Sequence, residues 1–124
     1  MNKKLLGRWG EERAAEYLKS RGYSIIGLNF GCRFGEIDII AKNAFYVIFA
    51  EVKLRKNASF ARAGESVTAA KRRRLMIAAD IWLLQNPSEL QPRFDVVEIY
   101  APNGAEASSV KINHLENAFG REDL

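Results

Sequence analysis

The chain has few of the residues that mark membrane or secreted proteins. It has 124 residues, one cysteine, three prolines, and no apolar run close to the roughly 20 residues that span a bilayer. The basic start, Met1 to Arg8, is not followed by the apolar stretch of a secretion signal. A single cysteine, Cys32, cannot form an internal disulfide. We therefore expect a cytoplasmic protein with no membrane-spanning segment.

Repeats, linkers and low-complexity stretches are also missing, and the length suits a single domain spanning residues 1–124. Apolar residues make up 48% of the chain, which is enough for a core and too many for a disordered protein. The net charge of +4 is a weak indication of a polyanionic partner. The basic residues are clustered, however, in the runs Lys53, Arg55, Lys56 and Lys71–Arg74, with Arg62 between them. Such runs are usually solvated faces, but they favour nucleic acid modestly.

The periodicity and the turn residues predict alternating helices and strands. Helices are expected over 4–20 and 66–85, because alanine, leucine and glutamate favour helix and Gly22 and Pro87 end it. Strands rich in branched and aromatic residues are expected over 23–29, 36–41, 46–54 and 93–100, with a turn over 31–35. A short edge strand near 110–112 and a flexible tail over 113–124 complete the chain. The fold class is α/β, a mixed sheet flanked by helices in the order αβββαβ.

Charged side chains interrupt two of the apolar strands. Strand 46–54 is nearly all apolar and so is expected at the centre of the sheet, with Glu51 and Lys53 on one face. In an antiparallel hairpin Asp38 would lie across from Glu51, and two such carboxylates repel unless a cation lies between them. A hard cation such as Mg²⁺ fits, and Lys53 would then activate water or stabilise charge on a phosphate. The alternative is an ordinary surface pair, Glu51 with Lys53, and a solubilising Asp38.

The first helix adds a carboxylate. At 100° per residue, Gly7, Glu11, Ala14, Ala15 and Leu18 share one stripe, so Glu11 is expected on the face that packs against the sheet. The adjacent Glu12 is expected to be solvated. Glu11 is either a packing or capping residue, or a third acid that completes a metal site or binds a second ion.

Taken together, these residues resemble the YraN-like family of uncharacterised bacterial proteins. The resemblance covers nearly the whole chain, and its motifs are jointly specific. They are Gly7-x-x-Gly10-Glu11-x-x-Ala14-x-x-Tyr17-Leu18, Gly22-Tyr23, Gly35-Glu36-Ile37-Asp38, Phe49-Ala50-Glu51-Val52-Lys53-x-Arg55, Lys71, Arg93-Phe94-Asp95-Val96-Val97 and Asn117-Ala118-Phe119. The resemblance implies a single restriction-endonuclease-like domain of the PD-(D/E)xK superfamily, similar to archaeal Holliday-junction resolvases.

The resemblance also implies roles for individual residues. Asp38 and Glu51 match the metal-binding acids, Lys53 the catalytic lysine, and Glu11 the helix-borne acid, while the backbone carbonyl of Val52 would be a further metal ligand. Two positions depart from the pattern. Ile37 stands where the superfamily name has proline, and Gly31 stands where the family is expected to have a basic residue, which puts a strand contact there in doubt.

The basic runs are the predicted nucleic-acid contacts. Lys71 is related to Leu75, Ala78 and Trp82 by steps of three or four, so it is expected to lean toward the active face, with Arg72 and Arg73 more exposed. We predict contacts to phosphate by Arg55, Lys71, Arg72 and Arg74, against the alternative that the run only solubilises its helix. His114 and Asp95 are interpreted as structural, and Trp9, Trp82 and Phe94 as core.

The leading hypothesis is a nuclease dependent on Mg²⁺ or Mn²⁺ that hydrolyses phosphodiester bonds in DNA, with branched or damaged DNA suggested by the resolvases. A homodimer is compatible with the same resemblance. One alternative is a non-catalytic nucleic-acid-binding protein that retains the nuclease fold, and another is a small structural domain that binds a protein. Fold similarity alone does not decide among them.

Overall fold

The structure is a computed structural model that describes residues 3–55, 67–101 and 110–121. Two helices and five strands are formed, α1 (Lys3–Ser20), β1 (Ser24–Cys32), β2 (Gly35–Lys42), β3 (Tyr46–Arg55), α2 (Ala69–Gln85), β4 (Gln91–Tyr100) and β5 (Lys111–Phe119). The strands make one sheet in the order β1-β2-β3-β4-β5. β3 and β4 are parallel, and the other neighbours are antiparallel. The predicted mixed sheet, its central third strand and the order αβββαβ are confirmed.

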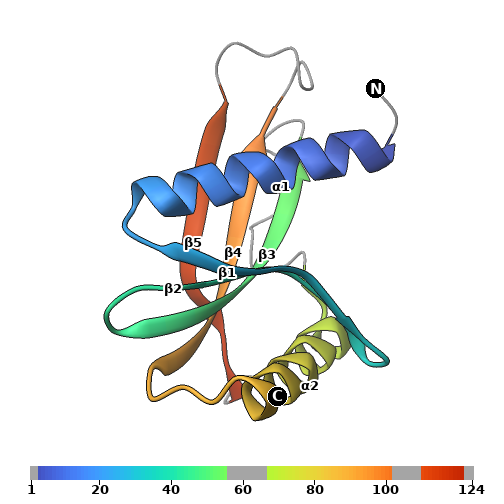
Figure 1. Cartoon of the computed structure of the whole chain (residues 1–124). Coiled ribbons are helices and arrows are strands. Elements are labelled where there is room, and N and C mark those ends of the chain that lie inside the picture. The colour runs from blue at the N-terminus through green and yellow to red at the C-terminus, as the bar shows by residue number, and fades with distance from the viewer. Residues whose placement is uncertain (1–2, 56–66, 102–109, 122–124) are drawn as a thin grey trace.

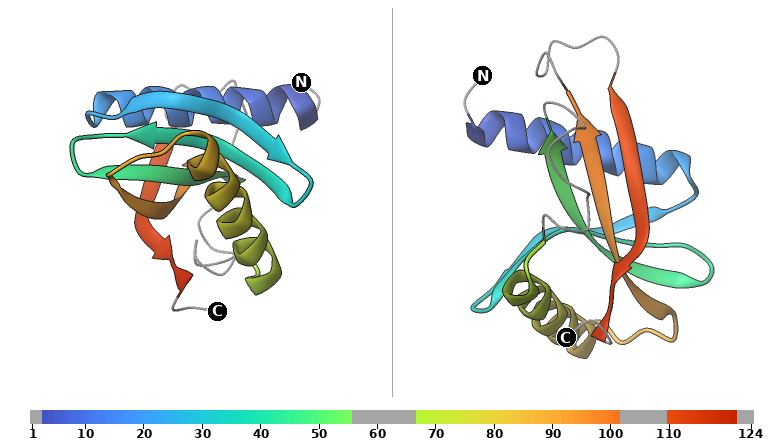
Figure 2. Two further views of the ribbon diagram at one scale, coloured as in Figure 1. Left: turned by 60° about the horizontal axis from the view of Figure 1, so that its bottom comes forward. Right: turned by 180° about the vertical axis from the view of Figure 1, so that it is seen from behind.

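The two helices cover opposite faces of the sheet. Alternate residues of β3 divide between two clusters, since Ile48 and Ala50 pack with Ala14 and Leu18 of α1, whereas Val47 and Phe49 pack with α2. α1 crosses the carboxyl ends of β3 and β4, and α2 lies at their other end (Figures 1 and 2). The predicted core residues Trp82 and Phe94 belong to the α2 cluster, and Trp9 packs against the α1 cluster. On the α2 side, the second half of β3 meets the first turn of α2, where Lys71 contacts Glu51.

The helix ends follow the sequence signals. Gly22 has φ of +93°, its N–H donates to the Lys19 carbonyl, and the Tyr23 N–H donates to the Leu18 carbonyl, which is a Schellman end for α1. At α2 the side chain of Thr68 accepts from the Lys71 N–H at 3.2 Å, so the helix begins at Ala69. The predicted start at 66 was early, and residue 66 lies outside the described residues.

Three other predictions need correction. The turn expected over 31–35 contains only residues 33 and 34, because β1 and β2 pair up to Cys32 and Gly35. The segment 113–119, expected in the tail, belongs to β5 and pairs with β4. The predicted stripe on α1 is split, since Ala14 and Leu18 are buried while Gly7 is exposed and Glu11 is half-buried. Gly10 replaces Gly7 on the packing face, where a Cβ atom would lie 3.5 Å from Leu54.

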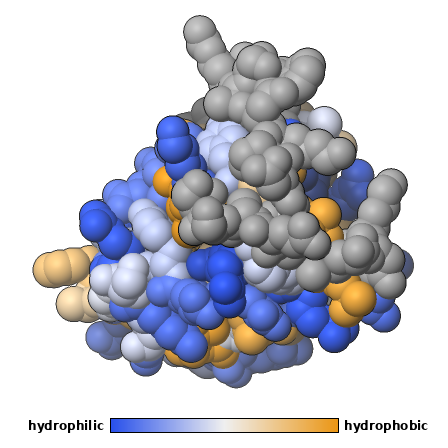
Figure 3. Space-filling view, turned by 90° about the horizontal axis from the view of Figure 1, so that it is seen from above, coloured by the Kyte–Doolittle hydropathy of each residue, from blue (hydrophilic) through white to orange (hydrophobic). Residues whose placement is uncertain are grey.

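Among the coloured residues on the face seen from above in Figure 3, most are hydrophilic, and the hydrophobic ones form small, separate patches. Neither described helix combines the length and the apolar character needed to cross a membrane.

A buried polar network connects β4 to Tyr23, which follows α1, and to β5. Arg93 donates to both oxygens of Asp95, at 2.8 and 2.7 Å, and to the Tyr23 hydroxyl at 2.6 Å. His114 lies 2.7 Å from Asp95, and the Asn117 N–H donates to it at 3.0 Å. Burial alone would raise the pKa of Asp95, but the hydrogen bonds from His114 and Arg93 lower it below its ordinary value. These partners agree with structural roles for Asp95 and His114.

We predict that Asp95→Ala lowers the free energy of unfolding by about 3–5 kcal/mol, because it leaves Arg93 charged and buried without its partner. Urea denaturation measures this. Asp80→Ala is the matched control, since the Asp80–Arg121 pair is exposed and its loss should cost less than about 1 kcal/mol. Equal losses in the two variants would contradict the assignment.

Candidate functional site

Strands β2 and β3 separate at Asp38. Their regular pairing ends at Ile39 with Ala50, and one further step would pair Asp38 with Glu51. Instead, the Asp38 carboxylate accepts a hydrogen bond from the Val52 N–H at 2.9 Å. The alternation of faces also shifts here, because Ile37 packs with the α2 cluster and Ile39 with the α1 cluster. The predicted hairpin is thus formed, and its irregular end holds a carboxylate between the strands.

Glu51 is the second carboxylate of this region. It is 5% exposed, and one of its oxygens, Oε1, contacts the ammonium groups of both Lys71 and Lys53, the latter at 3.5 Å. Lys71 reaches it from the first turn of α2, and Lys53 from the same face of β3. The contact with Glu51 confirms the expectation that Lys71 leans toward the acids. Leu75, Ala78 and Trp82 on the same stripe of the helix are buried, which turns this side of α2 toward the sheet.

The two acids line one open cavity. Its volume is about 520 Å³. The lining residues come from β2, β3, the α2 N-cap and α2: Gly35, Glu36, Asp38, Glu51, Thr68, Lys71, Arg74 and Leu75. The structure therefore brings four predicted site residues together, Asp38, Glu51, Lys71 and Arg74, with Lys53 adjoining through Glu51.

The electrostatics of the cavity are those of crowded charges. Burial and the Glu51 carboxylate raise the pKa of Asp38 to about 7, against the lowering effect of the Val52 N–H. Burial and the neighbouring Lys71 lower the pKa of Lys53. Burial alone would lower the pKa of Lys71, but Glu51 raises it above its ordinary value. The nearby Lys71 therefore does not bring the pKa of Asp38 back to its ordinary value.

The donor set fits a hydrated Mg²⁺ or Mn²⁺ ion better than a metal held by protein groups alone. In residues 3–55, 67–101 and 110–121, no three acidic, histidine or cysteine side chains gather around one possible metal position. Mg²⁺ usually keeps several waters and takes one or two carboxylates. Asp38 and Glu51 can supply these. The Val52 carbonyl points to the same strand edge as the Val52 N–H, toward Asp38.

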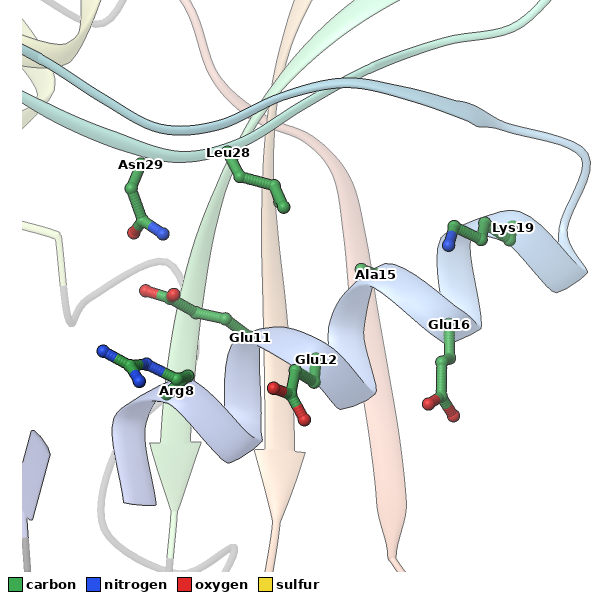
Figure 4. A pocket seen from close by; sticks show the side chains of 8 residues that line it. All are labelled: Arg8, Glu11, Glu12, Ala15, Glu16, Lys19, Leu28 and Asn29. Atoms are coloured by element: carbon green, nitrogen blue, oxygen red, sulfur yellow. The ribbon is translucent and has the colours of Figure 1, made fainter. Parts of the chain in front are cut away.

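Glu11 lies in an adjoining groove and not in the cavity. It extends from α1 toward Asn29 of β1, whereas Glu12 is exposed (Figure 4). Burial raises the pKa of Glu11, with further contributions from Glu36 and Glu51. The groove in Figure 4 does not include Glu36. A second pocket, lined by Lys4, Gly7, Arg8, Glu11, Asn29 and Glu36, adjoins the cavity through Glu36, which lines both. Glu11 is therefore close enough to affect the acids electrostatically, but it does not complete a cluster with them.

Sequence reasoning missed two residues of this region, Asn29 and Glu36. With its amide nitrogen turned toward the acids, Asn29 donates to Glu11 at 3.2 Å and to Glu36 at 3.0 Å. Its φ of 50° is a conformation that asparagine tolerates better than most residues. Glu36 was detectable, since it stands two residues before Asp38 in the same strand.

Two of the predicted phosphate contacts are engaged elsewhere. Arg72 is half-buried, and its Nε donates to the Val67 carbonyl at 2.9 Å while its guanidinium lies over the Phe119 ring, so the expected exposure of Arg72 is wrong. Arg55 pairs with the buried Glu98, with 3.4 Å between Nε and the carboxylate. Lys71 and Arg74 are the members of the predicted set that line the cavity.

We predict that Asp38→Asn stabilises the metal-free protein above pH 7. The folded pKa of about 7 exceeds the ordinary value of 3.8, so the folded state holds an extra proton between these values and loses stability as the pH rises through them. The asparagine removes that cost and can still accept from Val52, a gain of about 1–3 kcal/mol at pH 8 that shrinks toward pH 4. Urea denaturation with a chelator at several pH values measures it. Asp80→Asn, at an exposed site, should show no such trend, and a pH-independent difference for Asp38→Asn would contradict the prediction.

Comparison with known proteins places the chain among proteins of undetermined activity. The model of the uncharacterised protein family UPF0102 matches residues 10–99. A UPF0102 protein of Caldicellulosiruptor saccharolyticus is 42% identical over 120 residues, which cover 96% of this chain and all of the relative. The UPF0102 protein of Caldanaerobacter subterraneus is 39% identical over 96% of this chain and 98% of its own length. That of Symbiobacterium thermophilum is 43% identical, covering 92% and 95%. The chain therefore belongs to the uncharacterised protein family UPF0102.

Proposed function

We propose that the protein is a nuclease dependent on Mg²⁺ or Mn²⁺ that hydrolyses phosphodiester bonds in DNA. The observation that carries the proposal is the pair of carboxylates, Asp38 and Glu51, beside one open cavity, with Lys53 against Glu51. This arrangement agrees with the PD-(D/E)xK pattern that the sequence resembles. The raised pKa of Asp38 supports it further, because a bound cation would relieve the crowding of negative charge.

Asp38, Glu51 and the Val52 carbonyl would hold the ion. When bound, a divalent cation lowers the pKa of its water and neutralises charge on a phosphate. The Val52 N–H binds one Asp38 oxygen, so the other oxygen would be the one that contacts the ion. The contacts of Lys71 and Lys53 with Glu51 are made through Oε1, so Oε2 is the oxygen that would bind the ion.

The lysines and Arg74 would act on the phosphate. Lys53 has a lowered pKa, so it gives up a proton more readily than an ordinary lysine and can assist proton transfer at the attacking water. Lys71 and Arg74 occupy the start of α2, where the helix dipole is positive and basic side chains are unfavourable unless an anion is near. A substrate phosphate in the cavity would supply that anion.

Glu11 is assigned a supporting role. It lies beyond Glu36, so it would act through ordered water or on the approach of the substrate. Glu11 would not bind the same ion directly, because it does not line the cavity.

The second candidate is a nucleic-acid-binding protein without catalysis. The contacts of Lys71 and Lys53 with Glu51 favour it, because they neutralise this carboxylate without any metal. Binding to phosphates would then rest on Arg74 and the other exposed basic residues.

We predict that the purified protein cuts DNA with Mg²⁺ or Mn²⁺ and not with a chelator. Branched, single-stranded and duplex DNA are compared by gel electrophoresis. Lys53→Ala should slow cleavage by about 100-fold or more, because a positioned proton-transfer group contributes at least that much. Asp38→Ala should abolish it through loss of the metal. Arg73→Ala is the control, since Arg73 is exposed on α2 and does not line the cavity.

Metal-independent cutting, or equal cutting by Lys53→Ala and Arg73→Ala, would contradict the proposal. Binding that weakens steeply with salt, without cleavage of any substrate, would favour the non-catalytic candidate.

A further inference from the structure

The tip of the β1–β2 hairpin carries an exposed arginine and an exposed phenylalanine in contact with each other. Its two turn residues are Arg33 and Phe34, which follow Cys32 and precede Gly35 at the last strand pair. We propose that this tip is a stacking site for an unpaired nucleobase of the substrate. The inference rests on the proposed function and extends it to a substrate class, nucleic acid with unpaired nucleotides next to the cleavage point.

The turn does not need these residues for its own geometry. Neither turn residue has a positive φ, so the backbone does not select for a particular side chain at either position. Arg33 is exposed, and Phe34 is 39% exposed. A large aromatic side chain placed there loses much of the free energy that burial in the core would provide. Exposed aromatic residues on a loop beside a cavity indicate binding.

The pair has the chemistry of a base-stacking platform. The Arg33 guanidinium lies over the Phe34 ring, 5.2 Å from its centroid. Nucleobases stack on aromatic rings and on arginine planes, and every base offers a π-face, so such a platform is tolerant of sequence. The positive charge of Arg33 would also attract the phosphate of the stacked nucleotide. A docking site for a protein partner would not require the positive charge of Arg33 at the hairpin tip.

The hairpin tip lies next to the candidate active site. Gly35 lines the cavity, and a Cβ atom built on it would lie 3.5 Å from the Arg74 Cβ. In both figures the tip projects past the sheet beside the first turns of α2 (Figures 1 and 2). Arg74 therefore lies next to the residue that follows the platform and also lines the cavity with the acids, so it could hold an intervening phosphate.

The spacing fits a short stretch of nucleic acid. Phe34 precedes Asp38 by four residues of an extended chain, which is about 13 Å at about 3.3 Å per residue. Stacked nucleotides are about 3.4 Å apart along one strand, so the platform would meet a base at most about four nucleotides from the scissile phosphate. Bases inside a duplex are already stacked on their neighbours and cannot reach it without being unpaired. The site therefore selects for single-stranded, flapped or branched regions.

Phe45 provides a matched control at the other end of the same strand. It is 72% exposed in the turn between β2 and β3, and it does not line the cavity. Removing either phenylalanine takes an exposed aromatic side chain from a hairpin turn of β2, while only Phe34 stands at the proposed platform.

The test uses the full chain in EDTA, to prevent cutting, with oligonucleotides that carry 2-aminopurine at successive unpaired positions of a branched or single-stranded segment. We expect fluorescence quenching at one or two adjacent positions, and a loss of affinity of about 5-fold or more in Phe34→Ala. Phe34→Trp should retain both effects, and Phe45→Ala should behave as the unchanged protein. Affinity for fully paired duplex should be the same in all four.

Equal behaviour of Phe34→Ala and Phe45→Ala, or an equal loss on duplex, would overturn the inference while leaving the nuclease proposal in place. A protein that binds none of these nucleic acids would overturn both. Thermal unfolding of each variant checks that the fold is kept, which is expected because both side chains lie on exposed turns.

Discussion

The hydrogen bond from the Val52 N–H to the Asp38 carboxylate determines the rest of the candidate site. It replaces a contact that continued pairing of β2 and β3 would have made with backbone groups. A side chain takes up the Val52 backbone donor, so this N–H is paired where the regular strand pairing ends. The space opened in this way becomes the cavity, and α2 closes its other side. The same irregularity that weakens the sheet locally thus creates a place for a polar ligand.

Around this opening, charged side chains lie closer together than the stability of the fold alone requires. Burial and the Glu51 carboxylate raise the pKa of Asp38, and two ammonium groups share one Glu51 oxygen. Arrangements of this kind are strained in the free protein and relieved by a ligand, which is why perturbed groups gather at functional sites. Ala14 of α1 is buried in the core, whereas Glu11 of the same helix lines the groove shown in Figure 4. One helix thus contributes to both regions.

Much of this was accessible from the sequence, and the failures have physical causes. Alternation along β3 predicted that Glu51 and Lys53 share a face, and helical spacing predicted the direction of Lys71. The stripe on α1 failed because a helix with small residues on several sides can pack by more than one of them, and Gly10 allowed the closer approach. Periodicity also cannot reveal that Arg72 finds a carbonyl at Val67, nor that β5 continues to Phe119, since polar edge strands resemble tails. Asn29 was missed because its role depends on backbone conformation and long-range contacts.

The buried pair in β4 has a consequence for how the sheet opens. Its partners come from Tyr23, which follows α1, and from β5, at His114 and Asn117. Detachment of β5 would remove two of the hydrogen bonds that Asp95 accepts and would uncover one edge of β4. Because a partly satisfied polar network in the interior is costly, we expect the opening of this edge strand to be coupled to the unfolding of the sheet's centre.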